Sequence, residues 1–183
     1  MALPQSGGGK STVANLIARF WDVDEGVIRV GGVDVREMDY KYWMEQVSIV
    51  FQDTNLFKMS IMENVAVFNP DASREDVLQA LHLAQCDDIL EKLPQGADTV
   101  IGTKGIYLSG GEMQRIALAR AILKNAPVVL LDEATAFADA ENEYLIQKAL
   151  DELLRGKTVI MIAHRLSTIK DADLILVMDK GRI

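Results

Sequence analysis

The stretch SGGGKST, residues 6–12, decides how the rest of the chain is interpreted. Its three consecutive glycines let backbone N–H groups point at an anion without obstruction by side chains. Lys10 supplies a positive charge to the β- and γ-phosphates of a nucleoside triphosphate, and the hydroxyl of Ser11 suits Mg²⁺. The stretch therefore predicts a nucleotide site formed by Ser6, Gly7, Gly8, Gly9, Lys10, Ser11 and Thr12.

A helix is predicted to follow this loop directly. Apolar residues recur at helical spacing, at Val13, Leu16, Ile17 and Phe20. We expect this face to pack inward while the positive N-terminal end of the helix faces the phosphates. The usual pattern G-x-x-x-x-G-K-[ST] has a glycine where this chain has Pro4. A flexible Gly/Ser turn is the alternative, and the amphipathic helix that follows argues against it.

Length and composition restrict the class of protein. With 183 residues and 49% hydrophobic residues, the chain can form one globular domain with a core, or a core with a small inserted lobe. Its 19 basic and 27 acidic residues give a net charge of −8, which argues against a nucleic-acid surface. The single cysteine, Cys86, cannot form an internal disulfide and suits a reducing compartment. No apolar run reaches membrane-spanning length.

Three apolar segments are predicted to be buried strands that end in polar residues. They are VSIVFQD at 47–53, VVLLDE at 128–133 and TVIMIAH at 158–164. A last strand is predicted for ADLILVMD at 172–179. Helical patterns separate these strands, which favours an α/β fold with a mostly parallel sheet.

The polar residues that end these strands are predicted to meet at one edge of the sheet. Asp132 would hold Mg²⁺ directly or through water, and Glu133 could polarise the attacking water. His164 is expected to contact the γ-phosphate. Gln52 can reach both Mg²⁺ and the attacking water, although on its own it would be interpreted as an ordinary strand-terminal polar residue.

Helical patterns dominate residues 54–126, which we interpret as an inserted helical subdomain. The remaining residues, 1–53 and 127–183, would form the core. Three short helices are expected in LFKMSIMENVAVF, SREDVLQALHLAQ and DDILEKL, and Ser73 is the expected N-cap of the second, with Asp76 three residues later.

The segment LSGGEMQRIALARAILKNAP predicts a longer helix with an unusual start. Ser109 and Glu112 have capping-box spacing, and Gly110 and Gly111 remove side chains from the approach to the free N–H groups of the first turn. Such a helix end can receive an anion. A well-capped helix with a purely structural role is the equal alternative when the segment is considered alone.

Together, these motifs resemble the nucleotide-binding domain of ATP-binding-cassette (ABC) transporters over essentially the whole chain. The resemblance implies a P-loop NTPase core in which SGGGKST is the Walker A loop. LSGGE is then the signature, which distinguishes the family from other P-loop ATPases. The other implied roles are the Q-loop residue for Gln52, the Walker B aspartate for Asp132, the catalytic carboxylate for Glu133 and the switch histidine for His164.

The resemblance also implies partners and a location. In the family, Walker A of one domain and the signature of a second domain share each ATP, so a second cassette is expected, in a homo- or heterodimer. TVIGTKG at 99–105 and LFKMSIMENV at 56–65 resemble exporters that carry a membrane domain on the same chain. We therefore expect a partial sequence of an ATP- and Mg²⁺-dependent exporter at the cytoplasmic face of the plasma or inner membrane, with no nucleic-acid partner.

Two other functions stay open at this stage. A soluble cassette ATPase that acts on DNA or ribosomes would share the same catalytic motifs, but TVIGTKG and the acidic charge balance favour the exporter. A nucleotide-binding module without hydrolysis is the other alternative. Glu133 and His164 argue against such a module, whereas Pro4 argues for it.

Overall fold

A three-stranded parallel sheet lies at the centre of the protein. The computed structural model describes residues 8–51, 54–102, 106–132, 140–163 and 172–183. The strand order is β3–β4–β5, with β3 at Val47–Val50, β4 at Val128–Asp132 and β5 at Thr158–Ile162. The pairs Val47 with Val128 and Val128 with Thr158 set the register of the two ladders. The prediction of a mostly parallel α/β sheet is confirmed.

The central strand β4 sorts its side chains onto two faces, because successive residues of a strand point in opposite directions. Val129 and Leu131 pack into the larger apolar cluster, which includes Ile116 and Leu150. Val128 and Leu130 pack into a smaller cluster with Trp43. The run VVLL is thus apolar throughout because both faces of the strand are covered.

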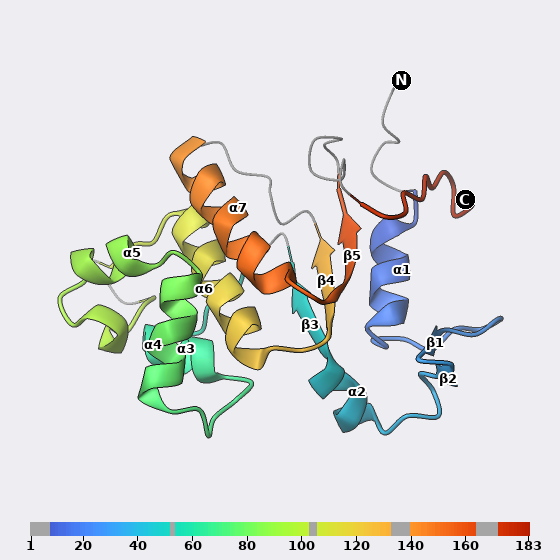
Figure 1. The fold of residues 1–183 in the computed structure, drawn as a ribbon, viewed down its shortest axis with the longest axis horizontal. Coiled ribbons are helices and arrows are strands. Elements are labelled where there is room, and N and C mark those ends of the chain that lie inside the picture. Colours follow the sequence, from blue (N-terminus) through green and yellow to red (C-terminus); the bar gives the residue numbers. More distant parts are fainter. Residues whose placement is uncertain (1–7, 52–53, 103–105, 133–139, 164–171) are drawn as a thin grey trace.

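Helices cover the two faces separately (Figure 1). On one side lie α6 at Gly110–Lys124 and α7 at Ala140–Leu154, and on the other lie α1 at Lys10–Ile17 and α2 at Tyr40–Gln46. The indole N–H of Trp43 donates a 3.2 Å hydrogen bond to the carbonyl of Ile17, which ties α2 to the end of α1. Within the described ranges, no helix combines the length and the apolar character needed to cross a membrane.

Short helices form the side of the molecule beyond α6. They are α3 at Ile61–Ala66, α4 at Arg74–Leu83, α5 at Asp87–Lys92 and the 3₁₀ turn η1 at Gly96–Asp98. The predicted cap of α4 is confirmed, because Ser73 and Asp76 form a complete capping box. Since α6 contacts β3 and α7 as well as α3 and α4, a separate subdomain over residues 54–126 remains a proposal.

A hairpin and a short helix connect α1 to the sheet. Strands β1 at Arg29–Val30 and β2 at Val33–Asp34 pair antiparallel. The turn between them consists of two glycines with positive φ, 58° and 86°, a conformation that other residues adopt at a cost. Asp39 caps helix α2, because its side chain accepts a hydrogen bond from the N–H of Tyr42.

The prediction that Val13 and Phe20 pack inward with Leu16 and Ile17 is wrong in part. Leu16 and Ile17 are half-buried, whereas Val13 and Phe20 are 38% and 40% exposed. The helix ends at Ile17, and the chain turns at Arg19, whose φ is 59°. Phe20 therefore leaves the helical face and stacks on Phe51, with ring centroids 6.2 Å apart.

The prediction of a strand at residues 172–179 is wrong. Residues 172–178 form no strand in the structure, and Leu174, Ile175, Leu176 and Val177 are exposed. An extended segment counts as a strand only when a neighbour completes its hydrogen-bond ladder, and the described residues supply none here. The predicted burial of β5 is also incomplete, since of its residues only Ile162 is fully buried.

Leucine-to-alanine substitutions at a buried and at an exposed position should lower the free energy of unfolding by different amounts. Leu150→Ala should lower the free energy of unfolding by about 2–5 kcal/mol, because Leu150 is 1% exposed and its removal leaves a cavity. Leu174→Ala should change it by less than about 0.5 kcal/mol, because Leu174 is 73% exposed. Urea unfolding of both variants measures the difference. Equal losses would contradict the exposed position of residue 174.

Candidate functional site

The described part of the phosphate loop leads into α1 through a glycine in the left-handed conformation. Gly9 is the N-cap of α1 with φ 91°, and its carbonyl accepts a 3.1 Å hydrogen bond from the N–H of Val13. Among the described residues, no side chain caps this helix end. The first N–H groups of α1 are thus left for another acceptor, as an anion site requires. Ser11 and Thr12 are exposed, and Lys10 is half-buried.

Residues 178–181 contact this loop from the other end of the sequence. The sequence alone did not predict this contact. The N–H of Gly181 donates a 3.1 Å hydrogen bond to the carbonyl of Gly8. A Cβ on Gly8 would lie 3.0 Å from the carbonyl oxygen of Met178, and one on Gly9 would lie 3.4 Å from the Cα of Gly181. The contact at Gly8 is tight enough to favour glycine there, whereas Gly9 is favoured by its positive φ of 91° rather than by packing. The dipeptide Lys180-Gly181 marks a turn, but nothing in the sequence says what the turn contacts.

Asp132 ends β4 on the side of the sheet that carries α1. It continues the face of Val128 and Leu130 by alternation, and α1 contacts both β4 and β5. The register pairs it with Ile162, and Asp132 is half-buried. Figure 1 shows the start of α1 and the carboxyl ends of β4 and β5 on the same side of the molecule. The structure thus places the first turn of α1, which carries Ser11, and the carboxyl end of β4, which carries Asp132, at the same edge of the sheet.

Five predicted site residues lie outside the described part of the chain: Ser6, Gly7, Gln52, Glu133 and His164. Their predicted roles therefore remain predictions. Among the described residues, no group of three or more His, Cys, Asp or Glu side chains is arranged to hold a metal ion.

The start of α6 has the predicted capping box. The N–H of Ser109 donates to the carboxylate of Glu112 at 2.7 Å, and the N–H of Glu112 donates to the Ser109 hydroxyl at 3.2 Å. Ser109 and Gly110 are exposed, whereas Gly111 is buried. A Cβ on Gly111 would lie 2.7 Å from Cγ of Asn142 in α7. The second glycine is therefore required by the contact between α6 and α7.

The structure does not bring the two candidate anion sites together. Figure 1 shows α1, which begins at Lys10, and α6, which begins at Gly110, on opposite sides of the sheet, so the sheet separates the starts of these two helices within one chain. An anion bound at the start of α1 would therefore be separate from one bound at the start of α6.

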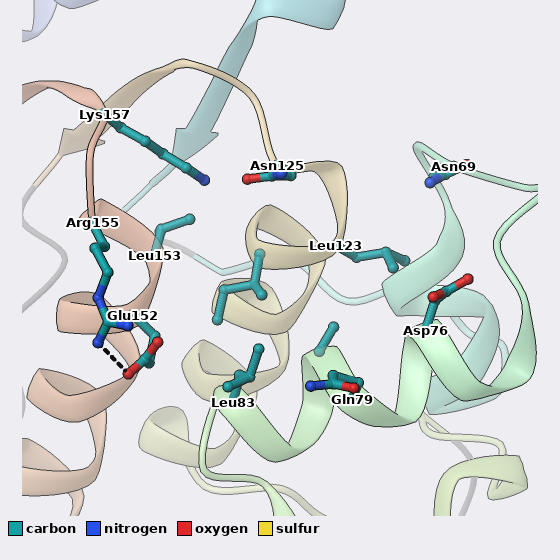
Figure 2. A pocket seen from close by; sticks show the side chains of 12 residues that line it. Asn69, Asp76, Gln79, Leu83, Leu123, Asn125, Glu152, Leu153, Arg155 and Lys157 are labelled. Carbon is teal, nitrogen blue, oxygen red and sulfur yellow. Dashed lines mark hydrogen bonds and ion pairs between the residues drawn. The ribbon is translucent and has the colours of Figure 1, made fainter.

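A cavity of about 570 Å³ lies elsewhere, between α4, α6 and α7 (Figure 2). Its rim includes the ion pair of Arg155 with Glu152 at 2.8 Å, and Lys157. Partial burial lowers the pKa of the Lys157 ammonium below its usual value. None of the described residues of the two predicted anion sites lines this cavity.

Comparison with known proteins finds similarity along most of the chain. The model of the family described as "ABC transporter" matches residues 3–136. The ATP-dependent lipid A-core flippase of Methylobacillus flagellatus is 51% identical over 180 residues, which are 98% of this chain and 31% of that protein. ABC transporter B family member 4 of Dictyostelium discoideum is 44% identical over 97% of this chain and 23% of that protein.

A solved structure extends the similarity to the fold. The structure described as a bacterial Atm1-family ABC exporter with ATP bound has a TM-score of 0.89 and 43% sequence identity. It aligns with 100% of this chain, which covers 32% of that longer chain. This chain thus spans about a third or less of the proteins to which it is similar. Because the family model matches most of its residues, the chain belongs to the ABC transporter family.

Proposed function

We propose that this chain is the ATP-binding and ATP-hydrolysing part of an ABC exporter. One observation carries the proposal: the uncapped start of α1 and the Asp132 end of β4 lie at one edge of the parallel sheet. Crevices at the carboxyl ends of parallel strands are where α/β proteins bind ligands. A helix N-terminus there supplies N–H donors and a positive potential for phosphate.

The chain's own residues would bind the triphosphate in stated ways. The N–H groups at the start of α1 would donate to the phosphate oxygens, and the ammonium of Lys10 would neutralise charge on the β- and γ-phosphates. Gly8 and Gly9 would allow the backbone to approach the phosphates closely. The contact of residues 178–181 with these glycines supports the loop from outside.

The donor set suits Mg²⁺ as the companion of ATP. The hydroxyl of Ser11 and the carboxylate of Asp132 are hard oxygen donors, and Mg²⁺ prefers one or two carboxylates or hydroxyls together with phosphate oxygens and water. A bound Mg²⁺ would neutralise charge on the phosphates. We propose Ser11, Asp132 and Gln52 as the protein groups around it.

Hydrolysis would depend on residues that follow the strands. Glu133 would accept a hydrogen bond from the attacking water and orient it towards the γ-phosphorus, and His164 would contact the γ-phosphate. Water then adds its oxygen to the γ-phosphorus as the bond to the β-phosphate oxygen breaks, giving ADP and phosphate. These roles are carried over from the family motifs.

A second cassette would complete each site. The exposed start of α6, with Ser109 and Gly110, is available to a nucleotide held by another chain. Because α1 and α6 lie on opposite sides of the sheet, a pair related by a two-fold axis would place each signature against the partner's phosphate loop. Such a dimer could consist of two copies of this chain or of this chain and a related one.

The proposed transport role rests on the relatives. Their names describe a lipid A-core flippase and an exporter. We propose a fused transmembrane domain as partner and the cytoplasmic face of the plasma or inner membrane as location, without assigning a cargo. A soluble ATPase that acts on nucleic acid is less favoured, because the net charge of −8 opposes binding to phosphate backbones.

Lys10→Ala tests the phosphate site. Loss of a charged hydrogen bond of about 1.5–3 kcal/mol should weaken ATP binding by about tenfold to a hundredfold, and hydrolysis should fall with it. Titration with labelled ATP measures the affinity. Lys41→Ala is the control, since it removes the same charge from the exposed face of α2. An unchanged affinity in Lys10→Ala would show that the phosphates bind elsewhere.

Glu133→Gln tests the hydrolytic step separately from binding. The variant keeps the shape of the side chain but removes its negative charge, so turnover should fall by about 10²-fold or more while ATP affinity is kept. Phosphate release at saturating Mg·ATP is the measurement, with Glu75→Gln on α4 as the charge-matched control. Near-wild-type turnover in Glu133→Gln would remove this residue from its proposed role.

A further inference from the structure

A buried arginine lies one helical turn after Gly111 on α6. The side chain of Arg115 is only 2% exposed. A cation in the interior is costly unless charged and polar partners surround it, and an apolar side chain would fill the same volume without that cost. Its partners therefore indicate what the charge contributes.

Arg115 joins three helices at one point. Its guanidinium makes a two-pronged ion pair with Asp88 of α5, at 2.6 Å to Oδ1 and 3.1 Å to Oδ2. It also donates to the carbonyl of Gln85, between α4 and α5, and to Oδ1 of Asn142 in α7 at 3.4 Å. The planar fork of an arginine fixes direction as well as distance, which a lysine does not.

The network continues from Asp88 to the cap of α6. Lys92 bridges the carboxylates of Asp88, at 3.4 Å, and Glu112, at 3.5 Å. Glu112 in turn accepts the 2.7 Å hydrogen bond from the N–H of Ser109. A chain of charged contacts thus connects the buried arginine with the residue that begins the helix.

Two further observations support a fixed geometry. Gly111 lies so close to Asn142 of α7 that even a Cβ at position 111 would clash, at 2.7 Å from Cγ of Asn142. Burial alone would raise the pKa of Asp88, but the hydrogen bonds and charge of Arg115, with a contribution from Lys92, lower it below its usual value. Asp88 therefore remains a carboxylate at neutral pH.

We propose that Arg115 is a positioning residue: with Asp88 and Asn142 it fixes the direction in which α6 presents Ser109 and Gly110 to a nucleotide on a second chain. This inference rests on the proposed function, because it concerns the signature end of the same composite site. A residue with only a structural role would affect stability and leave association in the presence of ATP unchanged.

The test uses the Glu133→Gln chain as parent, so that ATP is bound but not consumed. Into this parent we would place Asp88→Asn, which weakens the ion pair, and Arg115→Lys, which keeps the charge without the fork. Asp87→Asn is the matched control. Asp87 lies on α5 next to Asp88, but its side chain is exposed and pairs with His82 of α4 at 2.7 Å instead of with Arg115. Sedimentation velocity at saturating Mg·ATP measures association, and titration of labelled ATP onto dilute chains measures each chain's own affinity.

We expect the chain's own ATP affinity to stay within about twofold in all variants, because the phosphate loop is distant from the network. Association should weaken by about tenfold or more in Asp88→Asn and Arg115→Lys, and stay unchanged in Asp87→Asn. Unchanged association in the first two variants would overturn the inference, as would a parallel loss of ATP affinity. If Asp88→Asn does not unfold cooperatively, and is therefore not properly folded, the association of Arg115→Lys alone decides whether the inference holds.

Failure of the proposed function would give a different pattern. A parent chain that binds no ATP, or that stays monomeric with ATP bound, would refute the composite site and this inference with it. A parent that associates, together with variants that associate equally well, would refute the positioning role alone.

Discussion

Parallel pairing of β4 with β3 and β5 is the constraint on which the rest of the structure depends. Parallel strands end at the same edge, so the residues that follow Val50, Leu131 and Ile162 emerge on one side of the sheet. Parallel strands also need helices on both faces, which α6 and α7 supply on one side and α1 and α2 on the other. The same arrangement that buries β4 thus brings the start of α1 to the edge that carries Asp132.

The positions of the helix N-termini of α1 and α6 explain why two chains would be needed to complete one nucleotide site. No side chain in the described part of the chain caps the start of α1, whereas the start of α6 has a full capping box that leaves Ser109 and Gly110 exposed. Each offers N–H donors to an anion, and the sheet lies between them. We propose that one nucleotide uses the first end from one chain and the second end from another, with the network around Arg115 setting the direction of the second end.

Features set by residues close together in the sequence could be predicted, whereas contacts between residues far apart in the sequence could not. The caps of α4 and α6 involve residues three apart, Ser73 with Asp76 and Ser109 with Glu112, and both were predictable. The contact of Gly181 with Gly8 and the ion pair of Arg115 with Asp88 join residues far apart along the chain, which no local pattern encodes. Residues 172–178 have a strand-like pattern, but a strand also needs a neighbour. The roles of Gln52, Glu133 and His164 remain predictions from motifs.

The dependence of specific ATPase activity on protein concentration tests the shared site most directly. The 183-residue chain would be assayed at saturating Mg·ATP across a wide dilution series. If each nucleotide needs the phosphate loop of one chain and the signature of another, activity per chain must rise with concentration, because mass action sets the fraction of paired chains. Specific activity that is high and constant across the whole series would contradict the shared site and show that one chain hydrolyses ATP alone.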